Sequence, residues 1–208
     1  MNLELFGIGT PEQTPDGVRD PLDRYYTPEW ATQALVDYLG GRLAGGVWEP
    51  CVGKDWIGRV IRRSPLVTSW HGTDIDPDAS ILHWDEYGSS EISATRDFMH
   101  TVPNWPDLAW IVTNPPYKVG DLTATDFVRR ALQFSQGGVN VAMLLRLTWL
   151  EPCADRSDIL ANDPPTDVLI LPRVHFINAP SSNNCTSAWV IWDRNRPGSR
   201  VRWHRGRE

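Results

Sequence analysis

Residues 108–145 decide the fold: LAWIVT (108–113), NPPY (114–117), ATDFVRRALQFSQ (124–136) and VNVAMLL (139–145). The first segment predicts a buried strand. The third has apolar residues at helical spacing and is followed by two glycines, which predicts a helix over these residues. The last segment is apolar apart from Asn140, as in a central parallel strand covered on both faces. A strand, a helix and a second strand in succession form the repeating unit of a parallel α/β sheet.

The rest of the chain continues this alternation. Helical spacing begins at Thr27-Pro28, where threonine suits a helix cap and proline the first helical position. Further predicted elements are a strand at 47–49, a helix at 56–63, and strands at about 67–75, 91–94, 168–171 and 187–192. We therefore expect a single doubly wound α/β domain at residues 24–193. Residues 1–23 lack periodicity and predict a flexible arm, and residues 194–208 predict a basic C-terminal tail.

Bulk properties narrow the class of protein. The 208 residues are 41% apolar and 22% charged, as in a soluble globular protein with one core. No apolar run is long enough to span a bilayer, and the first residues lack the pattern of a signal peptide. The three cysteines are far apart, so we expect neither a disulfide framework nor a metal site. Together these features predict a cytoplasmic protein with no membrane partner.

Charge is unevenly distributed along the chain. The net charge of −6 is unfavourable for binding nucleic acid over the whole surface. Residues 194–207, however, carry six arginines and one histidine and no acid. Such a segment either adds solubility or binds backbone phosphate, because arginines that bind phosphate release condensed counterions.

Polar loops follow four of the predicted strands. They are EPCVG (49–53), GTDID (72–76), RDF (96–98) and NPPY (114–117). In an open α/β sheet, ligands bind at the carboxyl ends of the strands. We therefore expect these four loops to meet at one ligand site.

The NPPY loop is the most specific of these signals. Its two prolines fix the backbone, so that its carbonyl groups can face a ligand instead of a helix. The side-chain oxygen of Asn114 and the carbonyl of Pro115 can each accept one hydrogen from a flat amino group, which directs the nitrogen lone pair at an electrophile. The ring of Tyr117 offers a surface on which a base can stack. The alternative interpretation is a stiff loop after a strand.

With these motifs in one consistent order, the chain resembles the amino-methylating DNA methyltransferases, in particular small adenine-specific enzymes of the kind that phages carry. The resemblance spans roughly residues 23–192. It implies a Rossmann-like, mostly parallel seven-stranded sheet whose last strand is antiparallel. It also implies transfer of a methyl group from S-adenosylmethionine to the exocyclic amino group of adenine in double-stranded DNA, with the base flipped out of the duplex. The setting would be a bacterial or phage-infected cytoplasm.

The resemblance implies roles for individual residues. The catalytic loop would be Asn114, Pro115, Pro116 and Tyr117. Cofactor binding would involve Tyr26, Thr27, Pro28, Trp30, Glu49, Pro50, Cys51, Gly53, Asp74, Ile75, Asp97 and Phe98. The substrate would contact Phe176, Arg146, Arg173 and Lys118, with Phe176 as the second aromatic wall of the base pocket.

Within the cofactor set, Asp74 would bind both ribose hydroxyls while Ile75 lies against the adenine ring. Asp97 and Phe98 would recognise the cofactor's adenine. Each assignment has an ordinary structural alternative. Asp74 could cap a helix, Asp97 could belong to a surface turn, and Phe176 could be a core aromatic residue.

One position departs from the family pattern. The glycine-rich loop usually carries a further glycine two positions after the one matched by Gly53, and Asp55 stands there. A side chain restricts that turn, and its carboxylate would repel the carboxylate of the cofactor unless Lys54 compensates. Cofactor affinity is therefore the property that Asp55 puts in question.

Three functions stay open on the sequence. DNA adenine methylation is the favoured one. The second is methylation of RNA adenine or of a protein glutamine amide, because enzymes of both kinds use the same loop or close variants. The third is a cofactor-binding or nucleic-acid-binding module without turnover. The sequence leaves the recognition sequence, the biological role and the oligomeric state open, and a homodimer is one option.

Overall fold

The computed structural model describes residues 22–79, 91–92, 95–177 and 186–206. The predicted flexible arm lies outside these residues except for Leu22 and Asp23. Within the described part of the chain, no helix is long and apolar enough to cross a bilayer.

A central sheet organises the described structure, with the strand order β10-β8-β9-β7-β4-β1-β2-β3. In chain order, the first seven strands of this sheet are β1 (Gly45–Glu49), β2 (Val67–Gly72), β3 (Glu91–Ile92), β4 (Leu108–Thr113), β7 (Asn140–Arg146), β8 (Asp167–Ile170) and β9 (Ser187–Trp192). Neighbouring strands pair in parallel except for β9, which runs antiparallel to both β7 and β8. The predicted fold class, a doubly wound α/β sheet with a late antiparallel strand, is confirmed.

The sequence analysis did not predict the eighth strand. β10 (Arg200–Trp203) pairs in parallel with β8 at the edge of the sheet, with Val201 opposite Val168 and Trp203 opposite Ile170. The segment that we expected as a basic tail therefore extends the sheet. The sequence here lacks the alternation of apolar and polar residues that predicts a strand. Val201, Arg202 and Trp203 are all exposed, as is common in an edge strand.

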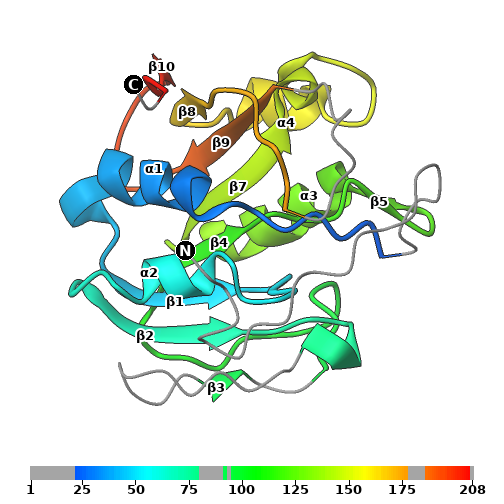
Figure 1. The fold of residues 1–208 in the computed structure, drawn as a ribbon. Helices are drawn as coiled ribbons and strands as arrows, with labels where there is room; N and C mark the ends of the chain where they lie inside the picture. The colour runs from blue at the N-terminus through cyan, green and yellow to red at the C-terminus, as the bar shows by residue number, and fades with distance from the viewer. Residues whose placement is uncertain (1–21, 80–90, 93–94, 178–185, 207–208) are drawn as a thin grey trace.

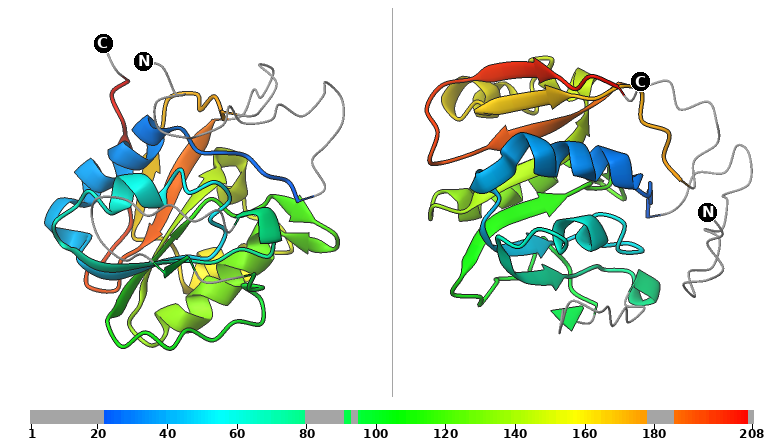
Figure 2. Two further views of the ribbon diagram at one scale, coloured as in Figure 1. Left: turned by 60° about the horizontal axis from the view of Figure 1, so that its bottom comes forward. Right: turned by 60° about the vertical axis from the view of Figure 1, so that its left-hand side comes forward.

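Helices cover both faces of the sheet (Figures 1 and 2). On one face lie α1 (Glu29–Leu39) and α2 (Gly58–Ile61), whose apolar side chains share a core cluster with Trp189. On the other face, α3 (Ala124–Ser135) packs in a second cluster with Trp192, and α4 (Ser157–Asn162) joins it through Ile159. Short connecting elements are η2 (Gly40–Arg42), η3 (Pro77–Ala79), η4 (Leu147–Leu150) and the hairpin of β5 (Lys118–Val119) and β6 (Leu122–Thr123).

The starts of the two long helices differ from each other. α3 begins at a capping box in which the Thr123 and Asp126 side chains each bond the other's backbone N–H. The predicted threonine cap of α1 is wrong. The helix starts at Glu29, Pro28 holds the N-cap position, and no side chain caps it. The hydroxyl of Thr27 instead accepts a hydrogen bond from Asn114, so a residue expected to start a helix serves the NPPY loop.

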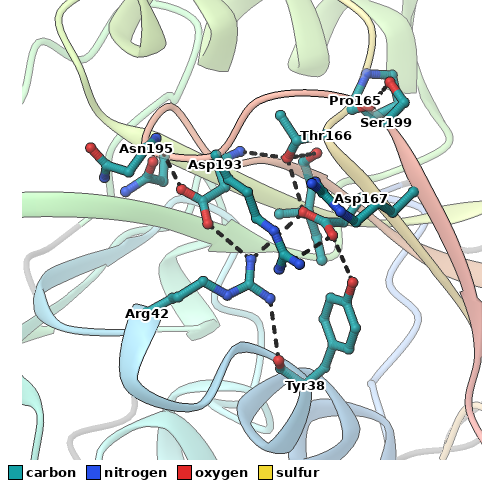
Figure 3. A network of polar contacts seen from close by, with 12 residues as sticks. Tyr38, Arg42, Pro165, Thr166, Asp167, Asp193, Asn195 and Ser199 are labelled. Atoms are coloured by element: carbon teal, nitrogen blue, oxygen red, sulfur yellow. Dashed lines mark hydrogen bonds and ion pairs between the residues drawn. The ribbon is translucent and has the colours of Figure 1, made fainter.

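A buried polar network ties the end of α1 to the sheet (Figure 3). Asp167 is fully buried in β8; its carboxylate accepts a 2.6 Å hydrogen bond from Tyr38 and lies 3.7 Å from Arg196. Arg42 donates a 2.9 Å bond to Asp193, which is also buried. Burial raises the pKa of the Tyr38 hydroxyl, and the Asp167 carboxylate adds a smaller effect in the same direction. Arg196 therefore has a structural role, which the sequence could not separate from those of the other C-terminal arginines.

Candidate functional site

A cavity with about 870 Å³ of space open to solvent lies at the carboxyl ends of β1, β2 and β4. The lining includes these residues singled out from the sequence: Tyr26, Thr27, Glu49, Pro50, Cys51, Gly53, Asp74, Ile75, Asp97, Phe98, Asn114 and Pro116. The sheet thus brings together all four of the polar loops that follow predicted strands.

Pro28, Trp30, Pro115 and Tyr117 are not among the residues that line the cavity. Pro28 precedes α1, and the ring of Trp30 lies 6.4 Å from that of His204 beyond β10. Trp30 therefore packs away from the proposed cofactor site.

The side chain of Asn114 has a fixed orientation. Its amide nitrogen donates to the carbonyl of Tyr25 at 2.8 Å and to the hydroxyl of Thr27 at 3.2 Å. Because the Tyr25 carbonyl can only accept, the amide nitrogen must face it, and the oxygen must point the other way. Asn114 Oδ1 is buried and has no hydrogen-bond partner among the described residues. An unsatisfied acceptor at the cavity is available for a hydrogen of a ligand.

Residues 23–27, which we call the strap, cross the carboxyl edge of the sheet and contact several of its loops. Asp23 accepts hydrogen bonds from the backbone N–H groups of Tyr117 (2.7 Å) and Lys118 (3.0 Å). Arg24 forms a 2.7 Å ion pair with Asp76 in the loop after β2. The carbonyl of Tyr26 accepts a bond from Ile177 after β8. The strap thus links the NPPY loop (114–117) to the loops on both sides of it.

Asp23 is an unusual residue in this strap. It is buried, and its φ of 54° lies in the left-handed region that few residues other than glycine, asparagine and aspartate adopt. A buried carboxylate that accepts two backbone N–H groups holds the chain after the two prolines in one position.

Aromatic rings form a row beside the NPPY loop. The guanidinium of Arg146 lies 4.6 Å from the centre of the Tyr117 ring. The Tyr25 ring lies 6.1 Å from Tyr117 and 5.5 Å from Phe176. Tyr25 therefore stands between the two residues that we expected to enclose a base. Phe176 is 6% exposed and belongs to the core cluster under α1, which fits its structural alternative.

Glu49, the last residue of β1, is a buried acid at the cavity. It is 1% exposed, and the Trp70 side chain lies near its carboxyl group. Burial raises its pKa well above the ordinary value, and the nearby Asp55 adds to the effect. A cationic group bound against this carboxyl would favour its ionised form.

Asp74 and Asp97 line the cavity while holding backbone turns. Asp74 accepts hydrogen bonds from the N–H groups of Gly53 (2.8 Å) and Asp76 (2.9 Å), and burial raises its pKa. Asp97 accepts from the N–H of Met99 and contacts His100 at 2.6 Å. A carboxylate oxygen can accept more than one hydrogen bond, so both acids keep capacity for a ligand.

Asp55 does not act as the sequence suggested. Its φ is 59°, a left-handed conformation that glycine adopts without strain and that aspartate tolerates. Its carboxylate receives two bonds from Arg62, of 3.0 and 2.6 Å, and Asp55 does not line the cavity. The charge that we expected to repel a cofactor carboxylate is thus paired within the protein, with Arg62.

The packing around this ion pair is close. Arg62 stacks over the ring of Trp70 at 4.4 Å. A Cβ on Gly58 would lie 2.3 Å from the Asp55 carboxylate and 2.4 Å from Trp70. Only glycine at position 58 leaves room for the pair in this arrangement.

The remaining predicted substrate residues lie outside the cavity. Lys118 is exposed in β5, and its backbone N–H bonds Asp23. Arg173 is exposed in the segment after β8.

Asp23, Tyr25 and Arg62 are site residues that the sequence analysis missed. No local pattern pairs Asp55 with Arg62, because the helix between them, α2, spans only Gly58–Ile61 and Asp55 has a left-handed φ of 59°. Nothing local distinguishes Asp23 from an acid in a loose arm.

No protein-family model matches this sequence, and no curated protein matches it in sequence. Solved structures with the same fold include a proposed class I S-adenosylmethionine-dependent methyltransferase from Listeria monocytogenes. Its TM-score is 0.63 at 12% identity, over 90% of this chain and 67% of that one. A modification subunit of a proposed type I restriction enzyme from Vibrio vulnificus has a TM-score of 0.62 at 14% identity, over 89% and 48%. A proposed RNA methyltransferase from Pyrococcus horikoshii has a TM-score of 0.60 at 12% identity, over 88% and 93%.

These comparisons establish the fold of class I methyltransferases. The chain spans about half the length of the Vibrio protein and nearly all of the Pyrococcus protein.

Proposed function

We propose that this protein transfers a methyl group from S-adenosylmethionine to the exocyclic amino group of adenine in DNA. The observation that carries the proposal is the oriented Asn114 side chain, whose unsatisfied oxygen is buried at a cavity on the carboxyl edge of a methyltransferase-type sheet. An amino group conjugated to a ring needs such an acceptor to direct its lone pair at a methyl donor.

The cavity fits the cofactor in chemical terms. Glu49 offers a buried carboxyl at the cavity that could receive the ammonium of the methionine part. Asp74 would accept the ribose hydroxyls, and Ile75, 53% exposed at the cavity, would contact the adenine ring. Pairing of Asp55 with Arg62 removes the main objection to binding of the cofactor carboxylate.

When bound, S-adenosylmethionine supplies an electrophilic methyl group on a sulfonium. The part of the protein is to hold the acceptor nitrogen in line with that group. Asn114 Oδ1 and the carbonyl of Pro115 would each accept one amino hydrogen, and both bonds strengthen as the nitrogen becomes positive. Positioning supplies most of the remaining rate enhancement.

A nucleic acid is favoured over a protein glutamine by the charge of the surface beyond the catalytic loop. Arg146 covers one face of Tyr117, and Arg173 is exposed further along the same edge. Phosphate is the natural partner of such residues. A glutamine side chain carries no phosphate and would not bind these arginines. RNA stays the second candidate substrate.

Methyl transfer from labelled S-adenosylmethionine to unmethylated duplex DNA tests the proposal, with RNA and total cell protein as parallel acceptors. We expect the label in N6-methyldeoxyadenosine after digestion to nucleosides. Label only in RNA or in glutamine would assign the same loop to the alternative substrates. Cofactor binding without any transfer would point to a module that lacks turnover.

Replacement of Asp23 is expected to slow methyl transfer without weakening cofactor binding. Asp23→Gly keeps the left-handed backbone but removes the acceptor for two N–H groups of the catalytic loop. A displacement of the loop by about 1 Å can cost on the order of 100-fold in rate. Steady-state kinetics should show a lower kcat and a nearly unchanged KM for S-adenosylmethionine.

Two variants control this prediction. Asp23→Asn retains an oxygen acceptor and tolerates the same φ, so it should recover part of the rate. Asp37→Gly removes an exposed carboxylate from α1 and should leave kcat unchanged although it weakens the helix. Wild-type kcat in Asp23→Gly would contradict a positioning role.

A further inference from the structure

The carboxyl edge of the sheet is divided by charge, with the catalytic loop after β4 near its middle. On one side, β1 ends at Glu49, and Asp74 follows β2. On the other side, β7 ends at Arg146, Arg173 follows β8, and Arg205 follows β10. The order of the strands, not of the sequence, produces this separation.

The structure also separates the C-terminal arginines into two groups. Arg194 makes two 2.6 Å bonds to Asp163, and Arg196 lies 3.7 Å from Asp167, so both have structural partners. Arg200, Arg202 and Arg205 have no carboxylate partner among the described residues. In the second group, Arg200 and Arg202 lie in β10, and Arg205 follows two residues after its end.

β10 delivers its end to the same edge as the catalytic loop. Figure 2 (right) shows β10, in red, running in the same direction as β8. The backbone of His204 bonds Ile170 at the end of β8. A Cβ on Gly206 would lie 3.5 Å from Pro172, so residues 204–206 run beside the segment that carries Arg173.

The surface formed there is basic and partly apolar. The segments 171–177 and 200–206 together contain four arginines and two histidines and no acid, in a chain of net charge −6. Trp203 is 70% exposed at its centre. A large exposed aromatic ring beside Arg202 and Arg205, which have no carboxylate partner among the described residues, is typical of a binding surface and is a poor way to add solubility.

We propose that Arg173, Trp203 and Arg205 form a contact surface for duplex DNA that flanks the target base. This inference rests on the proposed function. The arginines would bind phosphates, and the Trp203 ring would lie against the sugars between them. The arginines hold the duplex in register and do not read its sequence.

The dimensions suit this assignment. Four strand spacings separate β10 from β4, which at about 4.8 Å each gives about 19 Å. At about 3.4 Å per base pair along one strand, this distance corresponds to roughly five to six base pairs. A duplex with one base flipped at Asn114 would therefore reach β10 within about half a helical turn.

Binding of a fluorescent 24-base-pair duplex at several KCl concentrations tests the surface. The variant Arg173→Gln/Arg205→Gln should weaken binding on the order of tenfold or more and should lower the slope of log Kd against log salt by about 2, since each phosphate contact contributes about 0.9. Trp203→Ala should weaken binding with an unchanged slope, because it removes no charge. Arg63→Gln/Arg129→Gln is the matched control, with the same loss of charge from two exposed arginines elsewhere.

The outcomes separate this proposal from the proposed function. If the double variant binds like the control while the wild type methylates DNA, the assignment of this surface is wrong and the proposed function is unaffected. If the predicted salt slopes appear but no methyl reaches DNA, the surface stands and the reaction must be reassigned. Tighter binding of a duplex RNA, lost in the same variants, would overturn the assignment to DNA.

Discussion

Asn114→Ala is expected to lower methyl transfer by at least about 100- to 1,000-fold, the usual cost of one hydrogen bond that strengthens in the transition state. The substitution removes the buried acceptor Oδ1 and also the two bonds to Tyr25 and Thr27 that hold the strap. Cofactor affinity measured by calorimetry should stay near that of the wild type, because Glu49 and Asp74 are unchanged. Single-turnover rates with DNA in excess provide the readout.

Asn114→Asp gives a sharper test of the same assignment. It keeps an oxygen toward the cavity but turns a second oxygen toward the Tyr25 carbonyl, where two acceptors would repel each other. A protonated carboxyl can donate to that carbonyl, so the rate of Asn114→Asp should rise as the pH falls, while that of Asn114→Ala should not. Asn104→Ala, at an exposed position, is the control and should behave as the wild type. Wild-type rates in Asn114→Ala would show that the catalytic assignment is wrong.

Arg62→Ala is expected to destabilise the protein by about 3–5 kcal/mol, because it leaves the Asp55 carboxylate buried without a partner. Asp55 is 3% exposed, and Glu49 is a second buried acid in the same region whose pKa the Arg62 charge lowers. Loss of Arg62 also removes a cation from the face of Trp70. Urea unfolding followed by circular dichroism should show a lower midpoint with a similar slope.

The double variant Asp55→Gly/Arg62→Leu separates charge from packing. Glycine adopts the φ of 59° without strain, and leucine retains apolar contact with Trp70. We expect it to recover most of the stability lost in Arg62→Ala, and to bind S-adenosylmethionine. If Arg62→Ala has the same urea midpoint as the wild type, the ion pair does not stabilise the protein. The double variant would then show no recovery of stability.

The sequence was enough to predict the sheet and the four loops at its edge. Apolar runs such as 108–113 and 139–145 favour a buried parallel strand, because they are too short for a typical helix and an exposed strand would leave apolar surface in water. Polar residues that directly follow such strands must meet at one edge. The grouping of Glu49, Asp74 and Asn114 around one cavity therefore follows from local pattern and sheet geometry.

Other features depend on contacts between distant segments, which no local pattern records. Asp23 contacts Tyr117 and Lys118 across more than ninety residues of sequence, and Arg24 reaches Asp76 across 52. Tyr25 enters the space between Tyr117 and Phe176 only because the strap crosses the sheet edge there. Likewise β10 forms because β8 is left with a free edge, and an exposed edge strand has no apolar face to mark it.

Local sequence thus determined which residues could carry chemistry in this protein: an amide acceptor held by prolines, acids at strand ends and a run of arginines. The tertiary structure alone decided how they are used. It paired Asp55 with Arg62, turned the Asn114 oxygen toward the cavity, and gave Arg194 and Arg196 structural partners while leaving Arg202 and Arg205 at the surface. The physical reason is that the partner of a charged or hydrogen-bonding group is set by spatial proximity, and here most partners come from other strands and loops.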